Sequence, residues 1–131
     1  MRASTCMAVV LALLFAATPA AFANPPGTKL SADEIRQQLI DHTTYGQVNG
    51  LPYVQYVGPD GTQKIKMTNF SDSGTWRITG DGEWCRTWKI STGGKEECVT
   101  VYKSGDTYYS VTPQGAVRAS YTAKPGNPDR L

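Results

Sequence analysis

Turn-forming residues recur about every ten positions in the second half of the chain and separate short runs of β-branched and aromatic residues. The clusters are Gly58–Gly61, Ser71–Gly74, Gly80–Gly82, Ser91–Gly94, Ser104–Asp106 and Pro113–Gly115. Gly, Asp and Pro supply the positive or fixed φ angles that tight turns need. The pattern therefore predicts a mainly β fold, an antiparallel meander of about seven strands.

Three hairpin registers can be compared, because a slip of one residue moves every side chain of a strand to the other face. The pairs are Thr79 with Glu83, Cys85 with Cys98, and Lys103 with Thr107. All three predict one shared apolar face, made of Trp76, Ile78, Trp84, Trp88, Val99, Val101, Tyr109 and Val111. Such a sheet either curls into a small barrel or covers one face with a helix, and the sequence leaves both open.

One helix precedes these strands. Ser31 and Glu34 have the spacing of a capping box, which predicts a helix from Ala32 to His42. His42, the single histidine, falls on its apolar stripe and is interpreted as a packing residue. Proline- and glycine-rich ends predict a linker at 24–30 and a flexible tail at 122–131, which leaves a single β-rich domain at 31–121.

Residues 1–23 have the three-part pattern of a secretory signal peptide. Arg2 precedes an apolar run from Met7 to Ala17, and Ala21-Phe22-Ala23 forms a cleavage site. The run is too short to span a bilayer. We therefore expect a periplasmic or secreted protein with no stable membrane anchor after cleavage.

Charge and cysteine content limit the partners and the chemistry. Without Arg2, 12 Lys and Arg face 11 Asp and Glu, so nothing indicates a nucleic-acid partner. Cys85 and Cys98 are the two cysteines after the signal, and an even count in an exported chain predicts a disulfide. Without C-x-x-C spacing, this disulfide is interpreted as structural rather than redox-active.

Several of these motifs resemble those of a known family. They are Pro59-Asp60-Gly61-Thr62, Gly74-Thr75-Trp76, Asp81-Gly82, Cys85-Arg86-Thr87-Trp88, Cys98, Gly105-Asp106 and Tyr108. Together they resemble a bacterial family of exported proteins classed as a domain of unknown function, number nine hundred and ninety-five. The resemblance covers about Thr44 to Gly115. It implies a periplasmic location and a shared architecture, and it implies no activity or catalytic residue.

No catalytic, cofactor or metal motif stands out in the sequence. His42 lacks a partner at metal-ligand spacing, and the turn aspartates have a structural role in capping their own backbone. We therefore expect a protein that is not an enzyme and that uses no cofactor and no metal.

The remaining expectation is a binding function, of which two kinds are considered. The first expectation is a protein-interaction, accessory or inhibitor-type module of the cell envelope, whose surface would include Tyr45, Tyr53, Tyr56, Tyr102 and Tyr108. The alternative is a pocket for a small anionic or flat ligand, lined by Trp76, Arg86, Trp88 and Tyr109. Arg86 could instead form a structural cross-strand pair with Glu97. A closed pocket lined by Trp76, Trp88 and Arg86 would favour the ligand, and a filled core with an exposed aromatic patch would favour the protein partner.

Overall fold

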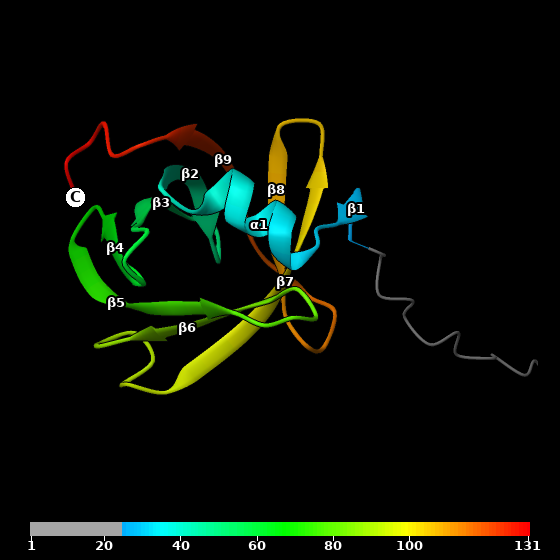
Figure 1. Cartoon of the computed structure of the whole chain (residues 1–131). Coiled ribbons are helices and arrows are strands. Elements are labelled where there is room, and N and C mark those ends of the chain that lie inside the picture. The colour runs from blue at the N-terminus through cyan, green and yellow to red at the C-terminus, as the bar shows by residue number, and fades with distance from the viewer. Residues whose placement is uncertain (1–24) are drawn as a thin grey trace, which may run out of the picture.

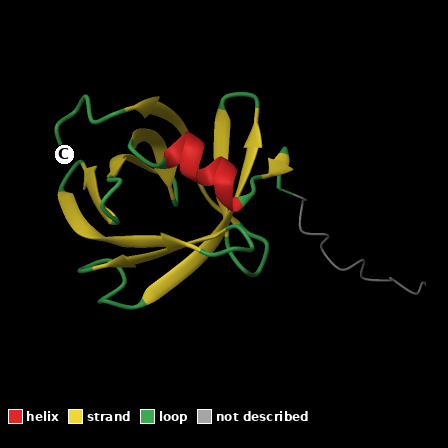
Figure 2. Ribbon diagram, viewed as in Figure 1, coloured by secondary structure: helices red, strands yellow, loops and turns green. Residues whose placement is uncertain are grey.

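The computed structural model describes residues 25–131, which form one helix and nine strands (Figure 1, Figure 2). The helix is α1 (Ala32–Leu39). The strands are β1 (Thr28–Lys29), β2 (His42–Val48), β3 (Leu51–Val57), β4 (Thr62–Met67), β5 (Phe70–Ile78), β6 (Glu83–Trp88), β7 (Glu96–Ser104), β8 (Thr107–Val111) and β9 (Val117–Pro125). The predicted signal peptide lies outside the described residues. Within residues 25–131, α1 is too short and too polar to cross a bilayer.

Eight of the strands close into an antiparallel barrel. Each strand from β2 to β8 pairs with the next strand in sequence, and β9 also pairs with β2. This last pairing closes the sheet, so that the eight strands of the barrel have no free edge. Short β1 adds to β7 beyond the end of β6. The predicted mainly β meander with one helix and one disulfide is confirmed. The strand count of about seven was slightly low, and the sheet takes the barrel form that the sequence left open.

Two of the three predicted registers are confirmed, and the third is wrong by one residue. Trp76 lies opposite Arg86, and Cys85 lies opposite Cys98. At the next hairpin Ser104 pairs with Thr107, because Gly105, with φ at 58°, allows a two-residue turn. The shift turns β8 over. Tyr109 therefore leaves the predicted apolar face, while Val111 pairs with Thr100 and is still buried.

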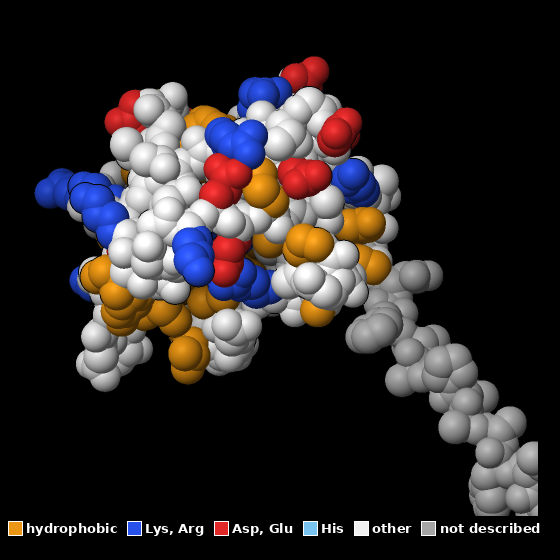
Figure 3. All heavy atoms as spheres, turned by 90° about the horizontal axis from the view of Figure 1, so that it is seen from below, with side chains coloured by type: hydrophobic (Ala, Val, Ile, Leu, Met, Phe, Trp, Pro, Cys, Tyr) orange, Lys and Arg blue, Asp and Glu red, His pale blue; other side chains and the backbone are white. Residues whose placement is uncertain are grey.

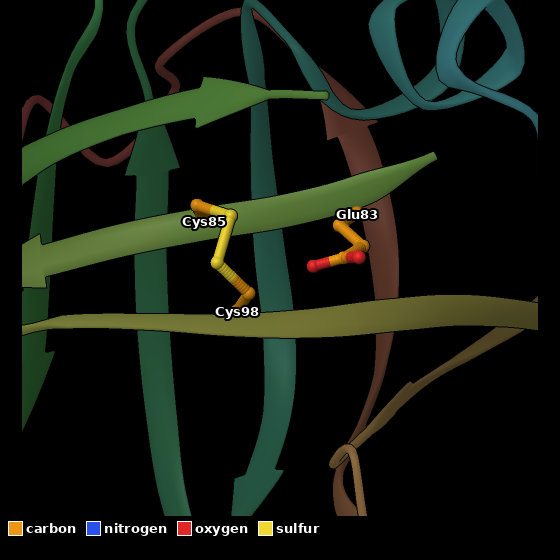
Figure 4. A group of neighbouring side chains, drawn as sticks. All are labelled: Glu83, Cys85 and Cys98. Carbon is orange, nitrogen blue, oxygen red and sulfur yellow. A yellow bond between two sulfur atoms is a disulfide. The ribbon is translucent and has the colours of Figure 1, made fainter. Parts of the chain in front are cut away.

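The disulfide prediction is confirmed. The Cys85 and Cys98 Cα atoms are 3.9 Å apart on neighbouring strands, and the bond lies on the outer side of the barrel wall (Figure 4). It closes a loop with a sequence separation of 13, for which the chain-entropy model gives about 3 kcal/mol.

The α1 helix closes one end of the barrel, across the opening seen in Figure 1. The capping box of Ser31 and Glu34 forms as predicted, and Ile35 and Leu39 are fully buried in the core. The helix ends at Leu39, earlier than predicted, because Ile40 is already extended, with ψ at 139°, and Asp41 then takes a left-handed φ of 56°. His42 therefore begins β2 and is not part of a helix stripe.

Paired strands extend past both ends of the predicted domain at 31–121. Before the helix, Thr28 and Lys29 pair with β7, and Leu30 is buried with its N–H donating to Val101 O. After residue 121, β9 continues to Pro125, opposite His42. Pairing with a long partner strand outweighs the weak local preference of these Pro- and Gly-containing ends.

The predicted turn at Ser71–Gly74 is also wrong, since these residues lie within β5. The chain instead reverses between Met67 and Phe70, which are paired. A second reversal occurs at Asn49-Gly50, where both residues have positive φ angles of 49° and 78°.

Candidate functional site

A pocket occupies the end of the barrel opposite α1, which we call the open end. Its volume is about 310 Å³, and its lining comes from the ends of β2 to β7 and of β9 and from two of the connections between them. The apolar part of the lining is Val48, Leu51, Ile65, Met67, Phe70, Trp88 and Ala119. Volumes from about 300 Å³ upward and mostly apolar walls are usual for small-molecule sites.

Arg86 supplies a cation to this apolar pocket. Its Nε atom is shielded from solvent, and no hydrogen-bond partner for Nε exists among residues 25–131. The guanidinium carbon lies 4.9 Å from the ring centre of Trp84, which is fully buried. Burial lowers the pKa of Arg86, but a guanidinium remains charged at neutral pH. A buried donor of this kind costs free energy until it meets an acceptor.

The predicted structural pair of Arg86 with Glu97 does not form, although the two residues are opposite each other on β6 and β7. Glu97 Oε2 instead accepts from Arg118 Nη1 at 2.5 Å. Arg118 comes from the start of β9, beside a register irregularity in the pairing of β8 with β9. The carboxylate nearest in register to Arg86 is thus already neutralised by another arginine.

Tyrosines form the wall next to Arg86. The rings of Tyr53 and Tyr121 meet edge to face at 6.4 Å, and Tyr121 stacks on Tyr108 at 5.7 Å. Gly46 lies between Tyr53 and Tyr121 on β2, where any side chain would collide with the neighbouring strand. Burial raises the pKa of Tyr121 to about 12. Burial likewise raises the pKa of Tyr53, so both phenols are neutral at physiological pH.

Asp72 fixes the β6–β7 connection, residues 89–95, at the open end. Its carboxylate accepts from the backbone N–H groups of Ser73, Ile90 and Ser91 and from the Ser91 hydroxyl. Burial raises the pKa of Asp72, but these hydrogen bonds outweigh it and hold the pKa below its usual value. Since Ser91 also lines the pocket, Asp72 holds one side of the pocket in place.

The structure brings together two of the four predicted ligand-binding residues. Arg86 and Trp88 line the pocket. Trp76 is on the same face but directs its indole N–H toward Gly58 O, at 2.9 Å, and lies outside the pocket. Tyr109 pairs with Tyr102 on the outer side of the barrel.

Several lining residues were missed by sequence reasoning. They are Tyr53, Gln55, Met67, Phe70 and Arg118. The Asn49-Gly50 pair is a recognised hairpin signal, and alternation read outward from it would have placed Leu51, Tyr53 and Gln55 on one inner face. No comparable signal marks Arg118, which reaches the site through a strand irregularity.

The tyrosine surface proposed for a protein partner is only partly present. Tyr53 and Tyr108 are 6% exposed and lie inside the barrel. Tyr45, Tyr56 and Tyr102 are half-buried, and the Tyr56 hydroxyl donates to Asp41. Figure 3 shows a different kind of face, where charged side chains of both signs mix near the centre with hydrophobic side chains beside them.

In the described part of the chain, one group of side chains has metal-ligand spacing, namely Glu83, Cys85 and Cys98 (Figure 4). Their ligand atoms lie within 4.8 Å of one another. Both sulfurs are joined in the disulfide and offer no thiolate, which is the form of cysteine that binds metals.

Scans against protein-family models, curated proteins and solved structures each found no match. The resemblance to the exported family therefore remains a prediction, and the function is inferred below from the geometry of the pocket.

Proposed function

We propose that this protein is an exported, non-catalytic binding protein that holds a small anionic ligand in the open end of its barrel. The observation that carries the proposal is the buried Nε of Arg86, a residue of the pocket lining, for which residues 25–131 supply no hydrogen-bond partner. An anion would satisfy this donor and neutralise the charge. Hydrogen bonds of a guanidinium to an anion are among the strongest available to a protein.

The pocket walls favour a ligand with an apolar or flat body. Trp88 and Phe70 offer aromatic surface, and Ile65 and Met67 offer aliphatic surface close to them. The planar guanidinium presents its donors in a fixed fork, which suits an acidic group with two or more oxygens. The signal-peptide pattern and the disulfide support a periplasmic or extracellular setting for this binding.

The test uses 1-anilinonaphthalene-8-sulfonate, a flat fluorescent anion. We expect saturable fluorescence enhancement with the wild type, and Arg86→Gln should weaken binding by about tenfold or more through the loss of charge-assisted hydrogen bonds. Arg77→Gln is the matched control, since Arg77 is on the adjacent strand but faces outward and pairs with Glu96.

Two results would contradict the proposal. One is an Arg86→Gln protein that is folded by circular dichroism and binds the dye as tightly as the wild type. The other is equal weakening by Arg77→Gln, which would mean that the dye responds to general surface charge.

A protein partner that docks on the rim of the open end is the second candidate function. The observation that favours it is the exposure of Leu51, Ile90 and Val117, at 59%, 65% and 47%. Large exposed apolar side chains often mark contact surfaces. A Leu51→Ser/Ile90→Ser protein should then lose the partner that cross-links to the wild type in envelope extracts, whereas an unchanged cross-linked product would contradict docking at this rim.

A further inference from the structure

Three charged side chains meet at the pocket. Arg118 and Glu97 neutralise each other at 2.5 Å, and Arg86 has no ion pair within the described residues. Asp72, on β5, does not line the pocket, and its oxygens are occupied by the β6–β7 connection. The pocket therefore carries a net charge of one positive unit.

From this charge balance, and resting on the proposed function, we infer that the site selects a monocarboxylate with an apolar body over dianions such as phosphate monoesters. A single carboxylate matches the single uncompensated guanidinium. A dianion would leave one negative charge unpaired in a site from which water is partly excluded, and unpaired buried charge is costly.

The geometry of Arg86 supports a carboxylate. Arg86 lines the pocket together with Tyr53, so an acidic group in the pocket can approach the guanidinium. A carboxylate offers two coplanar oxygens to the Nε–H and Nη–H edge, whereas a phosphate brings a third oxygen that needs a further donor. The uncharged polar residues of the lining are Asn49, Tyr53, Gln55 and Ser91.

Glu97 sets this selectivity. Because Glu97 holds Arg118, only one of the two arginines is available to a ligand. Glu97→Gln would release Arg118 and raise the net charge of the pocket to two positive units. The variant should therefore move the preference toward dianions, and Glu97 faces solvent enough, at 46% of its side chain, for the fold to tolerate the change.

The experiment compares two probes with the same flat body, 2-naphthoate and 2-naphthyl phosphate, by calorimetry at about pH 8, where the phosphate is a dianion. The wild type should bind naphthoate at least about tenfold more tightly. In Glu97→Gln this ratio should shift toward the phosphate by about tenfold or more. Glu96→Gln is the control, because Glu96 pairs with Arg77 on the outer side and should leave the ratio unchanged.

The inference is overturned if the wild type binds naphthyl phosphate as tightly as naphthoate, or if Glu97→Gln leaves the ratio unchanged. It is also overturned, with the proposed function intact, if neither naphthyl probe binds while the anilinonaphthalene dye still binds in an Arg86-dependent way. If the wild type binds neither the naphthyl probes nor the anilinonaphthalene dye, both the inference and the proposed function are overturned.

Discussion

Replacing Arg86 by Met should make the ligand-free protein more stable, because the buried Nε–H of Arg86 has no acceptor within residues 25–131. An unsatisfied buried donor costs about 1–3 kcal/mol. Contact of the guanidinium with the Trp84 ring, at 4.9 Å, returns part of that cost. Methionine has a similar length and can keep the contact with the indole. The expected net gain is about 1 kcal/mol, or a rise in melting temperature of about 4–8 °C.

Urea and thermal unfolding followed by circular dichroism would measure this change, on protein freed of ligand by refolding. Arg77→Met is the matched control and should lower stability slightly, since it removes an exposed ion pair with Glu96. A loss of more than about 1 kcal/mol in Arg86→Met would refute the reasoning, because it would mean that Arg86 is satisfied within the fold.

Three further predictions concern the scaffold. Changing Cys85 and Cys98 to Ala should cost about 3 kcal/mol in denaturant unfolding, and an unchanged midpoint would contradict a structural role for the bond. Gly46→Ala should destabilise far more than Gly50→Ala, because a Cβ at position 46 overlaps the backbone of β9 whereas position 50 faces open space; equal melting temperatures would contradict this packing. Because the folded-state pKa of Asp72 is depressed, its stabilisation is present above about pH 4 and is lost as pH falls through the folded value. Asp72→Asn should therefore show a shallower loss of melting temperature below about pH 4 than the wild type, and equal slopes would contradict the role of this carboxylate.

Sequence reasoning succeeded where two independent constraints agreed. The cysteine pair and the Gly80–Gly82 turn each fix the register of β6, and both place Arg86 beside Trp76 and opposite Glu97. At Ser104–Asp106 no second constraint exists, since the same residues suit a two- or a three-residue turn. The prediction assumed the three-residue turn, and this placed Tyr109 on the inner face instead of the outer face.

The character of the site depended on contacts that local sequence does not encode. Arg86 was correctly placed on the inner face, but within residues 25–131 it has no ion pair because Glu97 is taken by Arg118, which arrives only when β9 closes the barrel. In the same way, Asp72 lies in a strand paired with β4 rather than in a turn, and its carboxylate accepts from the distant β6–β7 connection. The pairing of β9 with β2 also places residues 122–125 of the predicted flexible tail in a strand.

NMR of the arginine Nε–H groups during titration with 2-naphthoate would show whether Arg86 binds the anion. We expect the Arg86 Nε–H signal to exchange slowly in the free protein and to shift saturably as the carboxylate binds, while the Arg77 signal stays in place. A saturable shift at other arginines with the Arg86 signal unmoved would contradict it.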